Sequence, residues 1–84
     1  MAWFYILYSR TLDRYYIGHT SEALAERLRK HLSDHHGWSS RAKDWQVAHF
    51  EQYPDKAMAY RREREVKGWK SRDRIRSLIA RTAR

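Results

Sequence analysis

Five polar side chains interrupt the apolar pattern of this sequence close to its predicted core: Tyr5, Tyr16, Arg27, His31 and Glu63. This set of groups could cleave a phosphodiester. A carboxylate can hold a hard divalent cation such as Mg²⁺, which acidifies bound water and neutralises phosphate charge. Arginine donates to phosphate oxygens through a planar fork. A tyrosine beside the attacking water can pass on its proton if the local field lowers the phenol pKa from about 10.

Each of these side chains also has an ordinary structural role open to it. Tyrosines in strands are commonly half-buried aromatics that fit a pleated face. Arg27 can lay its stem along the core edge and keep its head in water, and His31 can be a satisfied polar group near the core. Glu63 can pair with Lys67, four residues on, or with Arg62. Residue pattern alone therefore leaves a nuclease as one hypothesis among several.

A histidine pair raises a separate metal hypothesis. His31 and His35 are four residues apart on a predicted helix, a spacing that can place two imidazoles on one zinc ion. No glutamate follows His31 and the chain has no cysteine, whereas zinc sites take three or four such ligands. The sequence therefore favours a carboxylate site for a hard cation over a zinc site.

The two phenols are placed by a predicted hairpin. Two short runs rich in aromatic and β-branched residues, Trp3–Tyr8 and Tyr15–Ile17, flank a polar segment, which is typical of paired strands. Tyr5 and Tyr16 should therefore lie on neighbouring strands. Gly18 is predicted to end the second strand, where the chain turns sharply or lets another group approach.

A helix and a third strand are predicted next. Thr20 or Ser21 can cap the helix, and leucines at four-residue intervals form its buried stripe, with Arg27 and His31 on or beside it: Leu24, Leu28 and Leu32. After a loop at residues 36–43, the segment from Asp44 is predicted to be a strand. Its polar insertions indicate an edge position or one partly solvated face. Alternate residues of this strand should share one face: Trp45, Val47, His49 and Glu51.

Two further helices complete the predicted order. Pro54 breaks the third strand, and Asp55 can cap the helix that follows. Five residues lie along the inner side of this helix: Met58, Ala59, Arg62, Val66 and Trp69. Glu63 borders this side. Ser71 can cap a shorter helix whose apolar edge is Ile75, Leu78 and Ile79. The order β-β-α-β-α-α over residues 1–84 predicts a single α+β domain, a three-stranded antiparallel sheet flanked by helices.

The net charge of +8 narrows the class of partner. Ten of the 18 lysines and arginines lie in residues 61–84, opposed there by three acidic residues. A domain this basic commonly meets a polyanion, so we expect DNA, with RNA as an alternative. No apolar run reaches the roughly 20 residues needed to cross a bilayer, and the absence of cysteine fits a cytoplasmic protein.

Four motifs, in the same order along the chain, resemble those of the GIY-YIG nuclease superfamily. Trp3-Phe4-Tyr5 and, further on, Tyr16-Ile17-Gly18 are similar to its paired strand motifs. The leucine-rich helix with Arg27 and His31 resembles the one that carries the family arginine. Residues 59–63 and 67–69, with Glu63 and Lys67, resemble the segment that carries its metal-binding glutamate. The likeness spans residues 3–79 and is greatest to small stand-alone members.

The resemblance implies a metal-dependent DNA endonuclease or a repair-type, structure-specific nuclease. It implies that Glu63 is the sole protein ligand of one Mg²⁺ or Mn²⁺ ion and that Arg27 stabilises charge on the scissile phosphate. Tyr5 or Tyr16 would act as general base while the other orients the water. His31, the remaining catalytic candidate, would hydrogen-bond within the site and share in the proton transfer.

The expected DNA contacts lie outside this catalytic set: His19, Lys67, Arg72, Arg74 and Arg76. His19 stands where some relatives have lysine, and Trp3 and Phe4 replace the first glycine and isoleucine of the motif. The alternative is a module of the same fold that binds nucleic acid without cutting it. Because 84 residues leave little room for a specificity domain, we also expect a homodimer or a separate targeting protein.

Overall fold

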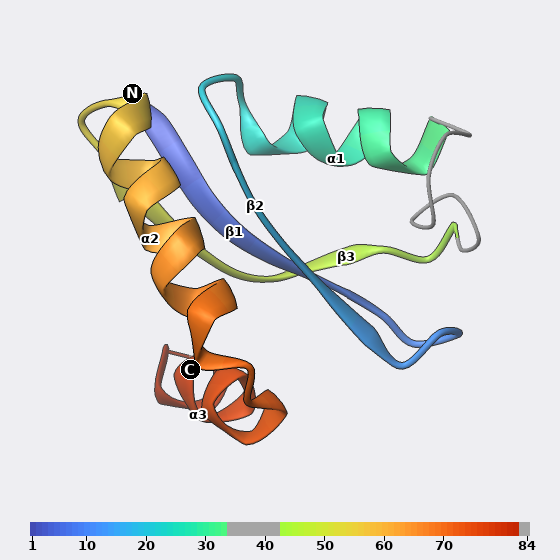
Figure 1. Cartoon of the computed structure of the whole chain (residues 1–84). Helices are drawn as coiled ribbons and strands as arrows, with labels where there is room; N and C mark the ends of the chain where they lie inside the picture. The colour runs from blue at the N-terminus through green and yellow to red at the C-terminus, as the bar shows by residue number, and fades with distance from the viewer. Residues whose placement is uncertain (34–42, 83–84) are drawn as a thin grey trace.

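The strands form one antiparallel sheet. The computed structural model describes residues 1–33 and 43–82. Within these ranges the strands are β1 (Ala2–Ser9), β2 (Arg14–Thr20) and β3 (Gln46–Tyr53). Their spatial order is β2-β1-β3, so β1 is central and β2 and β3 are edges (Figure 1). The predicted hairpin and the predicted edge position of β3 are confirmed.

Helices cover both faces of this sheet. Helix α1 (Leu24–Ser33) lies against one face, and helices α2 (Lys56–Trp69) and α3 (Arg72–Thr82) lie against the other (Figure 1). The order β-β-α-β-α-α and the α+β class are therefore as the sequence predicts. In the described ranges, no helix is both long enough and apolar enough to span a membrane.

Local capping explains where the helices begin. The Asp55 carboxylate accepts a hydrogen bond from the Met58 backbone N–H at 2.9 Å, and Ser71 Oγ accepts one from the Arg74 N–H at 3.3 Å. Both predicted caps are thus confirmed. The predicted start of α1 is wrong, because Thr20 is the last residue of β2 and the helix begins only at Leu24.

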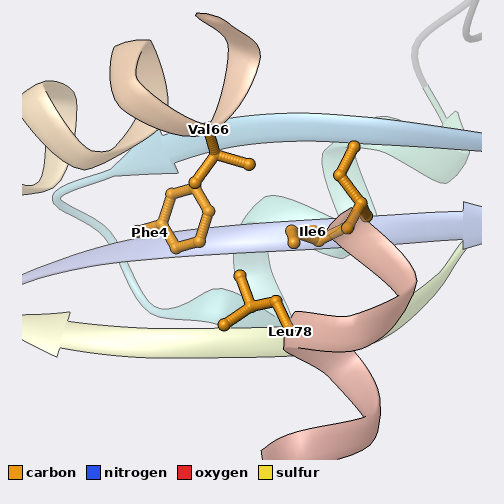
Figure 2. Packing of buried hydrophobic residues seen from close by; sticks show 5 residues of the cluster. Phe4, Ile6, Val66 and Leu78 are labelled. Carbon is orange, nitrogen blue, oxygen red and sulfur yellow. The ribbon is translucent and has the colours of Figure 1, made fainter. Parts of the chain in front are cut away.

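Two apolar clusters hold the layers together. Phe4 and Ile6 project from β1 toward Val66 of α2 and Leu78 of α3 (Figure 2). On the opposite face, Tyr5, Leu7 and Trp45 pack with the three leucines of α1. Burying a side chain of this size stabilises a fold by about 1.5–3 kcal/mol. Alternate residues of β1 therefore pack against the helices on opposite faces of the sheet. Met58, predicted on the inner side of its helix, is instead exposed at 40%.

A β-bulge corrects the predicted faces of β3. Ile6 pairs with His49 but the next residue, Leu7, pairs with Val47, so Ala48 is the extra residue between them. A bulge of this kind reverses the alternation of the strand beyond it. Val47 accordingly packs with Trp45 on the α1 face, while the His49 ring lies beside Phe4 on the face of α2. The sequence prediction that these residues share one face is wrong.

A polar network fixes α2 against β3. Arg62 donates to both carboxylate oxygens of Glu51, at 3.1 and 3.3 Å, and its guanidinium lies 5.7 Å from the centre of the Phe4 ring. His49 and Tyr53 also contact the Glu51 carboxylate. Burial disfavours ionisation of Glu51, but these hydrogen bonds outweigh it and hold its pKa below the usual range. Arg62 therefore fixes the rotation of the helix that carries Glu63.

Candidate active site

The candidate residues lie on both faces of the edge strand β2. In the β1–β2 register, Tyr5 pairs with Gly18 and Leu7 with Tyr16. Residues that pair directly project to the same face, so both phenols lie on the side of α1. His19 pairs with Phe4 and therefore projects to the opposite face, toward α2. A site that uses all of these groups has to span the edge of the sheet.

Gly18 makes room for the Tyr5 phenol. A Cβ atom added at Gly18 would lie 2.6 Å from Tyr5 Oη and 2.7 Å from Cζ, closer than real side chains approach. The Tyr5 ring and hydroxyl thus lie directly over the Gly18 backbone. The prediction that Gly18 ends the strand is wrong, because β2 continues to Thr20. The reason for the glycine is the other one foreseen, the close approach of a neighbouring group.

A hydrogen bond joins Arg27 of α1 to Tyr5 of β1. Arg27 Nε donates to Tyr5 Oη at 3.3 Å. Burial raises the pKa of the Tyr5 hydroxyl; Arg27 lowers it, and the nearby Tyr16 and Glu63 side chains add to the increase. The sequence hypothesis needed a lowered phenol pKa, and the burial of Tyr5 opposes that change.

Tyr16 lies beside this pair in a more accessible position. Its ring stacks on that of Tyr5 with 6.5 Å between centroids and meets the edge of Trp45 at 6.3 Å. Tyr16 lines an open depression of about 250 Å³ together with Tyr15, Ile17 and Lys67. Tyr5, by contrast, is only 1% exposed. Water from bulk solvent therefore reaches the surroundings of Tyr16 more readily.

Two side chains, His19 and Lys67, contact the Glu63 carboxylate on the α2 face. Its Oε1 lies 2.8 Å from His19 Nδ1, and its Oε2 accepts a hydrogen bond from Lys67 Nζ at 3.2 Å. The residue is 8% exposed, so burial of the carboxylate is compensated by these partners. Of the two structural roles foreseen for Glu63, pairing with Lys67 is present, whereas Arg62 pairs with Glu51 instead.

The Glu63 carboxylate suits a divalent cation that takes most of its ligands from water and substrate. Across residues 1–33 and 43–82, no three histidine, cysteine or acidic side chains gather to hold a metal. Mg²⁺ is commonly bound by one or two carboxylates, with water and substrate phosphate as its other ligands. A single buried carboxylate beside an open depression fits this mode of binding.

His31 lies in α1, but its side chain falls outside the described part of the structure, as does the whole of His35. The proposed hydrogen bond of His31 within the site and the zinc hypothesis therefore stay predictions.

The predicted DNA-contacting arginines of α3 differ in their surroundings. Arg72 donates to the Asp13 carbonyl at 3.0 Å and also to its carboxylate, and its guanidinium lies over Tyr15. Arg74 stacks on Trp69, 4.3 Å from the ring centre. Arg72 thus ties α3 to the β1–β2 turn, and Arg74 presents a positioned guanidinium at the surface.

Sequence reasoning treated His19 as a DNA contact and missed its place against Glu63. The signal was available in the alternation of β2. Residues 15, 17 and 19 share a face, and Ile17 on that face packs into the cluster beneath α2. His19 follows Ile17 by two positions and so projects toward the same helix.

The protein is thus an α+β domain in which two phenols, an arginine and a carboxylate gather near one edge of the sheet. A sequence model described as the GIY-YIG catalytic domain matches residues 1–76, and the chain belongs to this family. Its nucleases generally depend on a divalent metal and act on DNA. No match was found among curated proteins or among solved structures.

Gly18→Ala tests the close approach on which the site depends. The added methyl group has to displace the Tyr5 ring, so we expect a loss of about 1–3 kcal/mol in the free energy of unfolding. Gly68→Ala is the matched control: no atom lies within 4 Å of its added Cβ, and alanine is favoured over glycine inside a helix by about 1 kcal/mol. Urea unfolding of both variants measures the difference. Equal stability of the two would contradict the packing described.

Proposed function

We propose that this domain is a divalent-metal-dependent endonuclease that hydrolyses DNA phosphodiesters with low sequence specificity. The observation that supports it most is the meeting of four groups near the edge of β2, each from a different element: Tyr5, Tyr16, Arg27 and Glu63. A protein that only binds nucleic acid does not require a buried carboxylate beside the phenols. The basic body of the domain suits a polyanionic substrate.

Glu63 is the proposed ligand of Mg²⁺ or Mn²⁺. When bound, the ion supplies positive charge to the phosphate and makes a water molecule more acidic. Arg27 binds a non-bridging phosphate oxygen and offsets the charge that develops there. Its hydrogen bond to Tyr5 raises the Arg27 pKa and fixes the direction of the guanidinium. Lys67 neutralises the second oxygen of Glu63 and contacts the DNA backbone.

Tyr16 is the proposed general base. Its oxygen accepts a proton from the attacking water while its own proton passes to solvent in the depression. The water oxygen forms a bond to phosphorus, the bond from phosphorus to the leaving oxygen breaks, and the leaving oxygen takes up a proton from solvent. Tyr5, buried and bonded to Arg27, orients the water and the arginine. This assignment follows from the unequal burial of the two phenols.

Phosphate contacts position DNA without reading its bases, so a small open site of this kind predicts preference for DNA shape over sequence. A structure-specific or repair-type role in the cytoplasm is consistent with that preference. A homodimer or a separate targeting protein would supply further selection of the cleavage site.

Glu63→Gln should abolish cleavage with Mg²⁺ or Mn²⁺ and leave DNA binding within about threefold, since the phosphate-binding arginines remain. Glu65→Gln, an exposed position on the same helix, is the control and should cleave normally. Nicking of single-stranded, duplex and branched DNA gives the activity, and fluorescence anisotropy gives the affinity. Normal cleavage by Glu63→Gln would reject the metal ligand. Absence of cleavage by the unaltered protein on every substrate would favour the binding module.

Tyr16→Phe should lower kcat by about 10²–10⁴-fold, the usual contribution of a general base. Tyr5→Phe should cost at least tenfold less, because its hydroxyl acts through Arg27. Single-turnover cleavage at saturating DNA separates the chemical step from binding. A larger loss for Tyr5→Phe than for Tyr16→Phe would reverse the assignment.

Replacing Arg74 and Arg76 together by glutamine should reduce the slope of log K against log salt by about two, one for each lost phosphate contact. Arg29→Gln is the control, because this exposed arginine on α1 is paired with Glu26; its slope should match that of the unaltered protein. DNA titrations at several salt concentrations measure the slopes. An unchanged slope in the double variant would place the DNA surface away from α3.

A further inference from the structure

We propose that His19 is a second ligand of the divalent cation, so that Glu63 and His19 hold the ion as a carboxylate–imidazole pair. The inference rests on the proposed function, in which Glu63 is the metal ligand, and it adds a residue from a different strand. Its basis is the direct approach of Nδ1 of His19 to Oε1 of Glu63.

The separation of the two donor atoms suits adjacent positions on one ion. Metal–nitrogen and metal–oxygen bonds in proteins are about 2.0–2.2 Å long, so two ligands at right angles lie about 3 Å apart. Nδ1 and Oε1 are 2.8 Å apart. A cation can therefore join these atoms with only a small change in their separation, when Nδ1 is unprotonated and the ring proton is on Nε2.

The surroundings leave this pair accessible on one side. Lys67 occupies Oε2 of Glu63, which turns Oε1 toward His19. The His19 side chain is 18% exposed and lines an open depression of about 350 Å³ with Lys56, Ala57 and Tyr60. Water and a substrate phosphate can thus complete the coordination sphere, as catalytic metal sites require.

A second histidine–glutamate pair in the same domain shows what a purely structural pair looks like. His49 and Glu51 are also 2.8 Å apart, but the His49 side chain is only 3% exposed. The Glu51 carboxylate is already surrounded by Arg62 and Tyr53. The two pairs have the same separation but differ in access to solvent, because His19 lines a depression whereas the His49 side chain is almost fully buried.

An imidazole ligand changes which metals bind well. Mg²⁺ prefers oxygen ligands, whereas imidazole suits the transition metals, whose affinity for nitrogen sites rises from Mn²⁺ to Co²⁺ and Ni²⁺. The carboxylate–imidazole pair thus predicts that the protein without DNA binds Mn²⁺ and Co²⁺ more tightly than Mg²⁺. A lone carboxylate would discriminate among these ions much less.

Mn²⁺ binding to the DNA-free protein tests the pair without reference to catalysis. Electron paramagnetic resonance titration gives the affinity, and pulsed measurements detect coupling of the Mn²⁺ spin to an imidazole nitrogen. We expect one Mn²⁺ per chain with such coupling. His19→Asn should remove the coupling and weaken Mn²⁺ binding at least about tenfold, with a smaller effect on Mg²⁺ measured by competition. Glu63→Gln should weaken both ions.

His19→Asn also separates a ligand from a residue that only positions Glu63. The asparagine amide nitrogen can occupy the place of Nδ1 and still donate to Oε1, so a merely positioning role predicts unchanged Mn²⁺ affinity. Such a result, or Mn²⁺ binding without nitrogen coupling, or no binding by the unaltered protein, would overturn the inference. Mn²⁺-dependent nicking of DNA is measured separately. Equal cleavage by His19→Asn and the unaltered protein would reject this proposal alone, whereas absence of cleavage by the unaltered protein would reject the proposed function.

Discussion

The packing of Tyr5 onto Gly18 is the contact on which the candidate site depends. The phenols and Arg27 lie on the face of the sheet covered by α1, whereas Glu63 projects from α2 on the opposite face. A sheet normally keeps such groups apart, because its backbone and alternate side chains fill the space between them. A residue without a Cβ in the edge strand lets the Tyr5 hydroxyl lie against the backbone. The two halves of the site are thereby brought into electrostatic contact.

The sequence predicts what depends on local pattern. Period-two and period-four apolar spacing placed the strands and α1, and Asp55 and Ser71 were identified as caps because capping involves only the next three residues. Gly18 was misread as the end of a strand, because the reason for the glycine is a ring on the neighbouring strand. The bulge at Ala48 was missed for the same reason, since it exists only in the pairing of β3 with β1.

The sequence indicated which residues belong to the candidate site better than it indicated which of them contact one another. Polar residues on otherwise apolar stripes drew attention to Arg27 and Glu63, and the family motifs supplied proposed roles. The partners of Glu63 were harder to foresee. Arg62 precedes it and carries the opposite charge, yet it turns toward Glu51 on β3 and stacks on Phe4. Because Arg62 pairs with Glu51, the Glu63 carboxylate contacts His19 instead, a residue distant in the sequence.

The net charge of the chain is likewise predictable from composition, whereas the surroundings of each charged side chain depend on the fold. A net charge of +8 predicts a polyanionic partner without saying which cations meet it. Arg72 is engaged by Asp13, whose carboxyl pKa is lowered by its hydrogen bonds from Tyr8 and Arg72. Arg74, stacked on Trp69, loses less side-chain entropy when it binds an anion than an unsupported arginine would. Stacking positions a cation without neutralising it, whereas an ion pair does both. The arginines of α3 are thus unequal candidates for phosphate, and the difference arises from the aromatic and acidic neighbours that the fold brings to each.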